Sequence, residues 1–238
     1  MFVFVKRVSL NMDLGELPDE SDEFYSLATM ANIACGGHAG DRASMQRALV
    51  LARDSGANVA AHPSYPDRDA FGRKTLTISV SELENSLGDQ MAELIEIARN
   101  LNVPIKAVKP HGALYHDAAT SVNIAESLLG AMDKIFDSSV AVVGPPVGAL
   151  REMAQSRGRP YLDEGFADRT YLPDGRLAPR SQPNALLTNP EDAAAQAVRL
   201  AQSGQFDTLC VHGDTPNALS IARAVRNALM DAQLLGGV

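Results

Sequence analysis

The sequence has no excess of basic residues. Its 21 Lys and Arg are outnumbered by 29 Asp and Glu, which gives a formal net charge of −8 at pH 7. Proteins that bind nucleic acids neutralise phosphates with Lys and Arg, so this balance argues against a nucleic-acid partner. A local group of arginines can still bind an anionic substrate.

Cysteine is also scarce. Cys35 and Cys210 are the only two, and they lie far apart in the sequence. They fit no C-x-x-C spacing for a metal or a redox reaction. We therefore expect a reducing, cytoplasmic setting.

Long apolar runs and nucleotide motifs are missing as well. No run approaches the roughly 20 residues that span a bilayer, so we expect no membrane partner. The apolar stretch 1–5 is short, and Lys6 and Arg7 follow it, whereas an export signal has its charges first; we interpret it as a buried strand. The sequence contains no G-x-x-x-x-G-K-[ST], no G-x-G-x-x-G after a strand and no G-x-S-x-G, which excludes a recognisable phosphate loop and a serine-hydrolase elbow.

The sequence does contain seven short apolar runs bounded by turn residues, a pattern typical of parallel strands buried on both faces. The runs are 2–10, 32–34, 58–61, 105–108, 140–143, 160–162 and 208–211. Helical patterns lie at 44–55, 81–100, 121–134, 146–156, 190–202 and 216–235. Ser81 and Glu84 have the spacing of a capping box, and a proline opens each of the helices at 146, 190 and 216.

This alternation of strand and helix indicates a parallel α/β fold, either an open doubly wound sheet or a closed barrel. At least five of the expected strands end in polar clusters. In a barrel the residues after every strand converge on one face, whereas an open sheet gathers its ligands at a switch point. The sequence therefore favours an irregular seven-stranded, TIM-like β/α barrel. We expect a single catalytic domain over 1–238, since no linker interrupts the pattern.

Four of the five histidines belong to these strand-end clusters, which suggests one shared site and therefore an enzyme. The clusters are 35–38 with His38, 60–63 with His62, 109–112 with Lys109 and His111, 211–214 with His212 and Asp214, and 11–16 with Asn11, Asp13 and Glu16.

Each cluster also has a plain structural interpretation. Asp13 and Glu16 can divide acid and base roles or can merely belong to a turn. Asp41 is expected to be a helix N-cap, and Cys35 a small buried residue. His38 is harder to explain structurally, because its glycine-rich loop offers little to pack against.

Lys109 and His111 form the most specific of these clusters. A buried lysine can stabilise an oxyanion, while His116, further along, is expected at the surface. Asp214 can orient an imidazole or cap the helix after it, and both roles stay open. Asp13, His38 and His62 can supply a metal site, but strand-end histidines equally serve as acids, bases and donors.

Two long irregular stretches, 63–77 and 164–186, separate the expected elements. The second contains Asp168, Arg169, Arg180 and a Pro173-Asp-Gly turn signal. Loops of this length are usually functional lids or binding segments. A hairpin that merely covers the barrel is an equal alternative.

Seven motifs in order resemble those of the LamB/YcsF family, over nearly the whole chain. They are Asn11-x-Asp13-x-Gly15-Glu16, the stretch 31–41 with Asn32, Cys35 and His38, His62-Pro-Ser-Tyr65-Pro-Asp67, Phe71-Gly-Arg73, Lys109-Pro-His111-Gly-Ala-Leu-Tyr115, Phe166-Ala-Asp168-Arg169 and Val211-His212-Gly-Asp214. The sequence departs from the family pattern at Met12, in the short segment after Glu16 and at Gly37, where an aromatic residue is usual. We expect Gly37 to open space beside His38.

The resemblance implies a barrel similar to the glycoside hydrolase/deacetylase superfamily and membership of a bacterial ATP-dependent 5-oxoprolinase as its A subunit. The implied reaction converts 5-oxo-L-proline to L-glutamate with ATP, together with Mg²⁺, and with subunits B and C as partners. The catalytic candidates are Asp13, Glu16, His38, His62, Lys109, His111 and His212. The candidates for binding the lactam substrate are Asn11, Asn32, Tyr65, Arg73, Asp168, Arg169, Arg180 and Asp214.

Within this scheme Asp13 or His38 is the expected general base, and Lys109 and His111 stabilise charge on oxygen. Arg73, Arg169 or Arg180 would hold the substrate carboxylate, because arginine binds carboxylates in bidentate fashion. Two rival functions remain: a metal-dependent deacetylase or amidohydrolase, and a non-catalytic subunit that binds the lactam.

Overall fold

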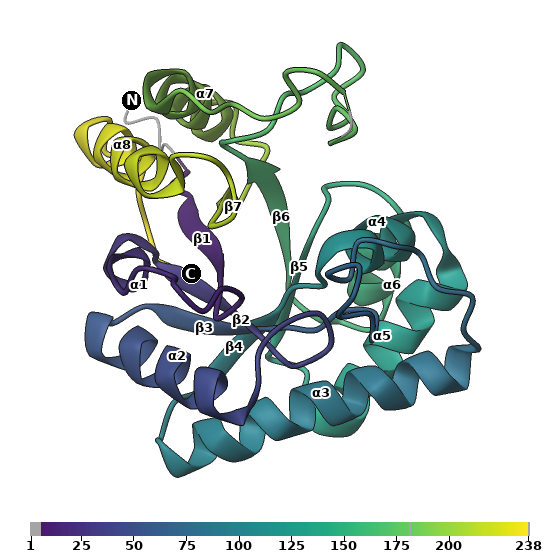
Figure 1. Ribbon diagram of the computed structural model, residues 1–238. Coiled ribbons are helices and arrows are strands. Elements are labelled where there is room, and N and C mark those ends of the chain that lie inside the picture. The colour runs from purple at the N-terminus through teal and green to yellow at the C-terminus, as the bar shows by residue number, and fades with distance from the viewer. Residues whose placement is uncertain (1–5, 181, 238) are drawn as a thin grey trace.

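A computed structural model describes residues 6–180 and 182–237, and its strands form a closed barrel (Figure 1). All neighbouring strands are parallel, and β1 pairs with both β2 and β7. The strands are β1 (Ser9–Leu14), β2 (Met30–Ala34), β3 (Asn58–His62), β4 (Ile105–Val108), β5 (Ala141–Gly144), β6 (Tyr161–Phe166) and β7 (Thr208–His212). The predicted seven-stranded β/α barrel is therefore confirmed.

Helices cover the outside of the barrel (Figure 1). They are α1 (Glu23–Leu27), α2 (Arg42–Ser55), α3 (Val80–Asn100), α4 (Gly112–Thr120), α5 (Val122–Ile135), α6 (Ala149–Ser156), α7 (Pro190–Gln202) and α8 (Ala218–Asp231). Between β4 and β5 the chain has two helices, α4 and α5, where the sequence predicted one. No helix in the described part of the chain is long and apolar enough to cross a membrane.

The strands alternate between an apolar outer face and a mixed inner face. In β1 the side chains of Leu10, Met12 and Leu14 belong to the main apolar core under the helices. Asn11, between them, instead hydrogen-bonds inward to β6 and β7. A separate small cluster fills part of the barrel interior, with Met30, Ala60, Ala107, Ala141 and Val143 as its buried members. The remaining interior positions include several buried polar residues, and these build the site.

Helix ends follow the expected capping chemistry, with one shift. Asp41 caps α2, because its carboxylate accepts from the Ser44 N–H at 2.8 Å, as predicted. The predicted capping box at Ser81 and Glu84 is wrong: Ser79 and Glu82 form it, and α3 starts at Val80. Ser79 can serve because its backbone is extended, with φ −70° and ψ 154°.

Several predicted boundaries differ from the structure. The predicted strand 2–10 begins in residues outside the described part, and β1 runs on to Leu14, so that Asn11 and Asp13 lie inside the strand. The strand predicted at 160–162 likewise extends to Phe166. The helices predicted at 146 and 216 begin at Ala149 and Ala218, because Gly148 (φ 109°) and Asn217 (φ 64°) have left-handed backbones. Only Pro190 opens its helix as predicted.

Candidate active site

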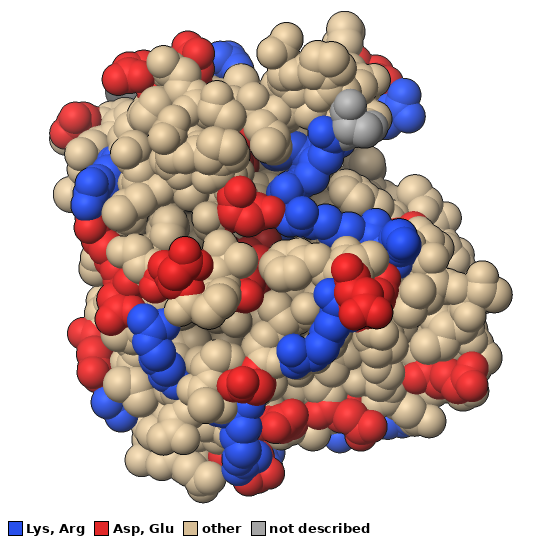
Figure 2. Space-filling model, in the orientation of Figure 1, with Lys and Arg blue, Asp and Glu red and all other residues tan. Residues whose placement is uncertain are grey.

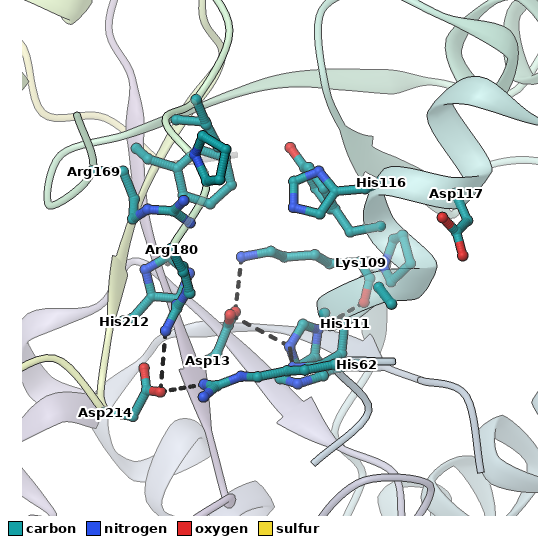
Figure 3. A pocket seen from close by; sticks show the side chains of 18 of the residues that line it. Asp13, His62, Lys109, His111, His116, Asp117, Arg169, Arg180, His212 and Asp214 are labelled. Atoms are coloured by element: carbon teal, nitrogen blue, oxygen red, sulfur yellow. Dashed lines mark hydrogen bonds and ion pairs between the residues drawn. The ribbon is translucent and has the colours of Figure 1, made fainter. Parts of the chain in front are cut away.

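The carboxyl ends of the strands surround a cavity of about 500 Å³ (Figure 3). Its size falls within the roughly 300–1,000 Å³ usual for small-molecule sites. The polar lining comes from several strand ends and the loops after them: Asp13, Glu16, His62, Arg73, Lys109, His111, His116, Arg169, Arg180, His212 and Asp214. The structure thus brings residues from all five predicted clusters close together, and residues of four of them line one cavity.

Lys109 forms the centre of a buried network across the barrel. Its Nζ lies 2.8 Å from Asp13 Oδ1, 3.0 Å from Glu164 Oε1 and 3.2 Å from Asn11 Oδ1. Cys210 Sγ is a fourth neighbour at 3.2 Å. An ammonium group has three hydrogens, so these neighbours occupy all of its donors. The geometry therefore makes Lys109 a group that holds Asp13 in place.

The pKa values of Asp13 and Lys109 shift in opposite directions. Burial by itself raises the pKa of Asp13, but the charges of His62 and Lys109 bring it well below its usual value. Burial lowers the pKa of Lys109, and the carboxylate of Asp13 with its other neighbours raises it well above the usual value. Both groups are therefore held in their charged forms.

Glu164 is a site residue that the sequence analysis missed. It is 2% exposed and contacts Lys109 and Asn11 from β6. The predicted strand stopped at residue 162, so Glu164 counted as the start of a loop. An acidic residue two positions after Leu162 points to the same face of a strand, and this signal could have revealed it.

A second group contains Glu16, His38, His62 and His111, whose possible metal-ligand atoms all lie within 4.8 Å of one another. Glu16 Oε1 lies 2.9 Å from His38 Nε2 and 3.1 Å from His111 Nδ1. Asp13, which the sequence analysis placed in the possible metal set, belongs to a different group with Cys210 and His212. Its nearest approach to the second group is 3.4 Å, from Oδ2 to His62 Nε2.

His38 does not stand free in a glycine loop as expected. Its ring stacks on that of His111 with centroids 3.6 Å apart and an angle of 5°, and it packs edge-on against Phe71. Burial lowers the pKa of His38 to about 4. His38 is absent from the cavity lining, which argues against its predicted role as a base acting on a bound substrate.

Gly37 does not open space beside His38 either. A Cβ at this position would lie 2.4 Å from Gln90 Oε1 and 2.5 Å from Ser64 Oγ. Gln90 and Ser64 are themselves hydrogen-bonded to each other through the Ser64 backbone, at 3.0 Å and 2.9 Å. The room that a side chain would need is therefore already filled.

Asp168 and His212 form a buried carboxylate–imidazole pair. His212 Nδ1 donates to Asp168 at 3.0 Å, and the His212 backbone N–H donates to the same carboxylate at 3.0 Å. Thr215 Oγ1 donates to it as well, at 2.9 Å. A neutral His212 ring thus keeps its proton on Nδ1 and exposes the Nε2 lone pair. Asp168, which is predicted to bind substrate, is engaged by His212 and Thr215 and does not line the cavity.

Asp214 neither orients an imidazole nor caps the following helix, which are the two structural roles expected for it. Its carboxylate pairs with Arg73 and Arg180, which come from the loops after β3 and β6 (Figure 3). The N-cap position of α8 belongs to Asn217. The Asp214 carboxylate thereby ties three loops together at the rim of the cavity.

Arg169 has donor capacity left over. It is 4% exposed and lines the cavity, and its Nη2 donates to the Ala178 carbonyl at 2.7 Å. Its buried Nε has no hydrogen-bond partner. Burial and the neighbouring Arg180 charge lower the pKa of Arg169. A bound anion would balance the positive charge of Arg169 and Arg180.

The loop after β6 forms one wall of the cavity. Leu177, Ala178 and Pro179 line the cavity, and the predicted turn is present as an antiparallel bridge between Tyr171 and Leu177.

Figure 2 shows basic side chains gathered along a hollow in the middle of one face of the molecule.

Some predicted residues lie next to the cavity without lining it. Tyr65 is buried, and its hydroxyl donates to Asp117 at 2.9 Å. Asn32 donates to Asn11 and Asp13, each at 2.8 Å, inside the barrel. These three predicted residues (Asn11, Asn32, Tyr65) do not line the cavity, but each hydrogen-bonds to a residue that does. His116 is exposed, as predicted, and it also lines the cavity.

Comparison with known proteins gives a consistent result. The model of the LamB/YcsF family matches residues 8–235. The chain is 40% identical to the A subunit of 5-oxoprolinase from Carboxydothermus hydrogenoformans, with 97% of this chain and 96% of that protein aligned. It is 39% identical to the corresponding 5-oxoprolinase chain of Methylococcus capsulatus, with coverage of 94% and 92%.

Solved structures extend the comparison. The lactam utilization protein from Thermus thermophilus is 35% identical and has a TM-score of 0.90, covering 97% of this chain and 99% of that one. A family 4 carbohydrate esterase from Streptomyces lividans, in complex with acetate, has a TM-score of 0.53 at 13% identity, with coverage of 98% and 92%. This second likeness concerns the fold alone.

Proposed function

The chain belongs to the LamB/YcsF family, and we propose that it works as the A subunit of a cytoplasmic, ATP-dependent 5-oxoprolinase. In this role it opens 5-oxo-L-proline to L-glutamate together with subunits B and C, with ATP and Mg²⁺ as co-substrate. The names of the relatives support the lactam, and the free, buried Cys35 and Cys210 fit a reducing compartment.

One observation carries the proposal: the cavity combines a buried arginine with an imidazole that can transfer protons and a carboxylate that can orient water. Arg169 would bind the carboxylate of 5-oxoproline through its guanidinium group, because the residue lines the cavity. Asp13 and His212 line the same cavity. A small cyclic amide that carries a carboxylate has the features these groups recognise.

ATP supplies the drive that an unactivated lactam lacks. Transfer of the γ-phosphoryl group to the lactam oxygen releases ADP and makes the ring carbon electrophilic. Water then adds to that carbon, the C–N bond breaks and the nitrogen takes up a proton. A second water converts the resulting acyl phosphate to L-glutamate and phosphate. Because the sequence has no phosphate-loop motif, we assign the phosphoryl transfer to the assembly with subunits B and C.

We assign the proton transfers to His212 and the orientation of the attacking water to Asp13. His212 Nε2 would accept a proton from the attacking water and return one to the lactam nitrogen, while Asp168 holds Nδ1. Asp13 Oδ1 is engaged by Lys109 and Asn32. Its Oδ2, 3.4 Å from His62 Nε2, is free to accept a hydrogen bond from the water.

The test is release of glutamate from 5-oxoproline and ATP, with this chain alone and with subunits B and C. We expect release in the mixture, and a loss of about 10²–10⁴-fold in Asp13→Asn. The matched control is Asp174→Asn, which changes an exposed carboxylate that does not line the cavity. Full activity of Asp13→Asn would contradict the assignment of Asp13. Acetate release from N-acetyl substrates without ATP, and no glutamate, would instead favour the deacetylase alternative.

A further inference from the structure

The facing ring nitrogens of His62 and His111 are the starting point. His62 Nδ1 lies 2.7 Å from the Lys109 carbonyl oxygen, and His111 Nε2 lies 3.0 Å from the Phe71 carbonyl oxygen. A carbonyl oxygen only accepts, so both of these nitrogens carry hydrogen. If both rings are neutral, the other two nitrogens, His62 Nε2 and His111 Nδ1, face each other at 3.0 Å with lone pairs. Two such facing lone pairs repel each other unless a metal cation or a proton lies between the rings.

Glu16 completes a triangle with these nitrogens. Its Oε1 lies 3.1 Å from His111 Nδ1 and 3.6 Å from His62 Nε2. Three ligands that occupy corners of a tetrahedron about 2.0–2.1 Å from one ion lie roughly 3.3–3.4 Å from each other. The observed triangle has this size. All three residues also line the cavity, so the fourth corner can face it.

Each of the three side chains is held by a further hydrogen bond. Lys109 and Phe71 provide the carbonyls that orient the two imidazoles. Glu16 receives a hydrogen bond from His38 Nε2 at 2.9 Å. Metal-binding histidines and carboxylates are oriented by outer contacts of this kind.

His38 itself is not placed to bind the same ion. Its ring is parallel to the His111 ring, with centroids 3.6 Å apart. The lone pair of an imidazole lies in the plane of its ring, and lone pairs in two parallel planes do not meet at one point. The His62 and His111 rings are by contrast nearly perpendicular, at 83°. The ring orientations therefore allow His62 and His111 to bind one ion, and they leave His38 as a residue that supports Glu16.

The other convergent group in the described part of the chain, Asp13, Cys210 and His212, is already balanced by a cation. The Lys109 ammonium lies 2.8 Å from Asp13 Oδ1 and 3.2 Å from Cys210 Sγ. A metal ion there would have to displace this ammonium. We therefore regard the group of Glu16, His62 and His111, and not this one, as the candidate metal site.

We propose that Glu16, His62 and His111 form a site for one divalent first-row transition-metal ion, with the fourth position open to the cavity. Two imidazole nitrogens and one carboxylate oxygen form a ligand set that is known for Zn²⁺ and for non-haem Fe²⁺, and we use Zn²⁺ as the probe. When bound, the ion supplies Lewis acidity toward an oxygen atom in the cavity. This inference does not rest on the lactam reaction, because metal binding is measured without any substrate.

The experiment uses the full chain, stripped of metal and titrated with Zn²⁺ by calorimetry, with metal analysis after gel filtration. We expect one equivalent in the wild type and less than about 0.1 equivalent in His62→Gln and His111→Gln, because removal of one of three ligands opens the site. The matched control, His116→Gln, changes a cavity histidine outside the triangle and should retain one equivalent. His38→Ala should keep the stoichiometry and lose about 10–100-fold in affinity.

Two outcomes would overturn the proposal. One is a wild type that binds no Zn²⁺, which would mean that a proton lies between His62 and His111. The other is equal Zn²⁺ content in wild type and His111→Gln, which would place the ion elsewhere. Circular dichroism checks each variant, and if His62→Gln does not fold, His111→Gln decides. Zn²⁺ should also raise the Tm of the wild type and of His116→Gln but not of His111→Gln.

Discussion

Removal of the Asp168 carboxylate should destabilise the barrel strongly. Asp168 is fully buried and accepts hydrogen bonds from the His212 side chain and backbone, each at 3.0 Å, and from Thr215 at 2.9 Å. In Asp168→Ala a backbone N–H and a hydroxyl lose their acceptor, and each unsatisfied buried group costs about 1–3 kcal/mol. The hydrogen bond from the His212 ring to the charged carboxylate is lost as well, and such bonds contribute about 1.5–3 kcal/mol, so we expect a total decrease of about 3–5 kcal/mol in the free energy of unfolding.

For a chain of 238 residues this change is large enough to measure easily. Each kcal/mol lowers Tm by about 2–4 °C at this size, so Tm should fall by about 6–20 °C. Urea titration followed by circular dichroism gives the free energy directly. The control is Asp174→Ala, whose exposed carboxylate pairs only with Arg176 in its own turn, and it should stay within about 0.5 kcal/mol of the wild type. An Asp168→Ala variant as stable as this control would refute the reasoning.

The same substitution has a defined dependence on pH. Burial raises the pKa of Asp168, but the charge and hydrogen bonds of His212 outweigh burial and bring the pKa below its usual value. The stabilisation by such a carboxylate is fully present above the unfolded pKa of about 3.9 and is lost as pH falls through the folded pKa. The difference in stability between wild type and Asp168→Ala should be full-sized near pH 7 and should shrink below about pH 4. A difference that grows on acidification would contradict this account.

Two other predictions concern buried positions near the site. Gly37→Ala should lower the free energy of unfolding by about 1–3 kcal/mol, because its Cβ meets Gln90 and Ser64. Gly237→Ala, with nothing within 4 Å of its Cβ, is the control in the same urea titration, and equal stability of the two variants would exclude the clash. Burial raises the pKa of the Cys35 thiol to about 12, so the native protein should leave it unmodified by a thiol reagent near pH 8 while denatured protein reacts; fast labelling of the native thiol, located by peptide mass, would disprove its burial.

Local patterns in the sequence determined the architecture. Short apolar runs alternate with helical patterns, and this alternation is set by neighbouring residues, so the seven strands and the barrel could be predicted. The ends of elements were less predictable. Asn11 and Asp13 resemble turn residues, but they lie inside β1 because the barrel interior provides polar partners for them.

The types of residue in the site could also be predicted from the sequence, since polar side chains after parallel strands converge on one face of a barrel. Their pairing could not. Asp168 and Asp214 are equally suited by type to orient an imidazole, and only the tertiary structure places Asp168 against His212. Likewise, Lys109 and Glu164 meet across the barrel.

The reason is geometric. A hydrogen bond depends on differences of tenths of an ångström between atoms that lie far apart in the sequence, such as the 96 positions between Lys109 and Asp13. Strand register and helix packing set these differences, and no local pattern encodes them. The sequence alone determined which chemical groups reach the end of the barrel. The closed barrel decided which of them form hydrogen bonds with one another and which balance charge.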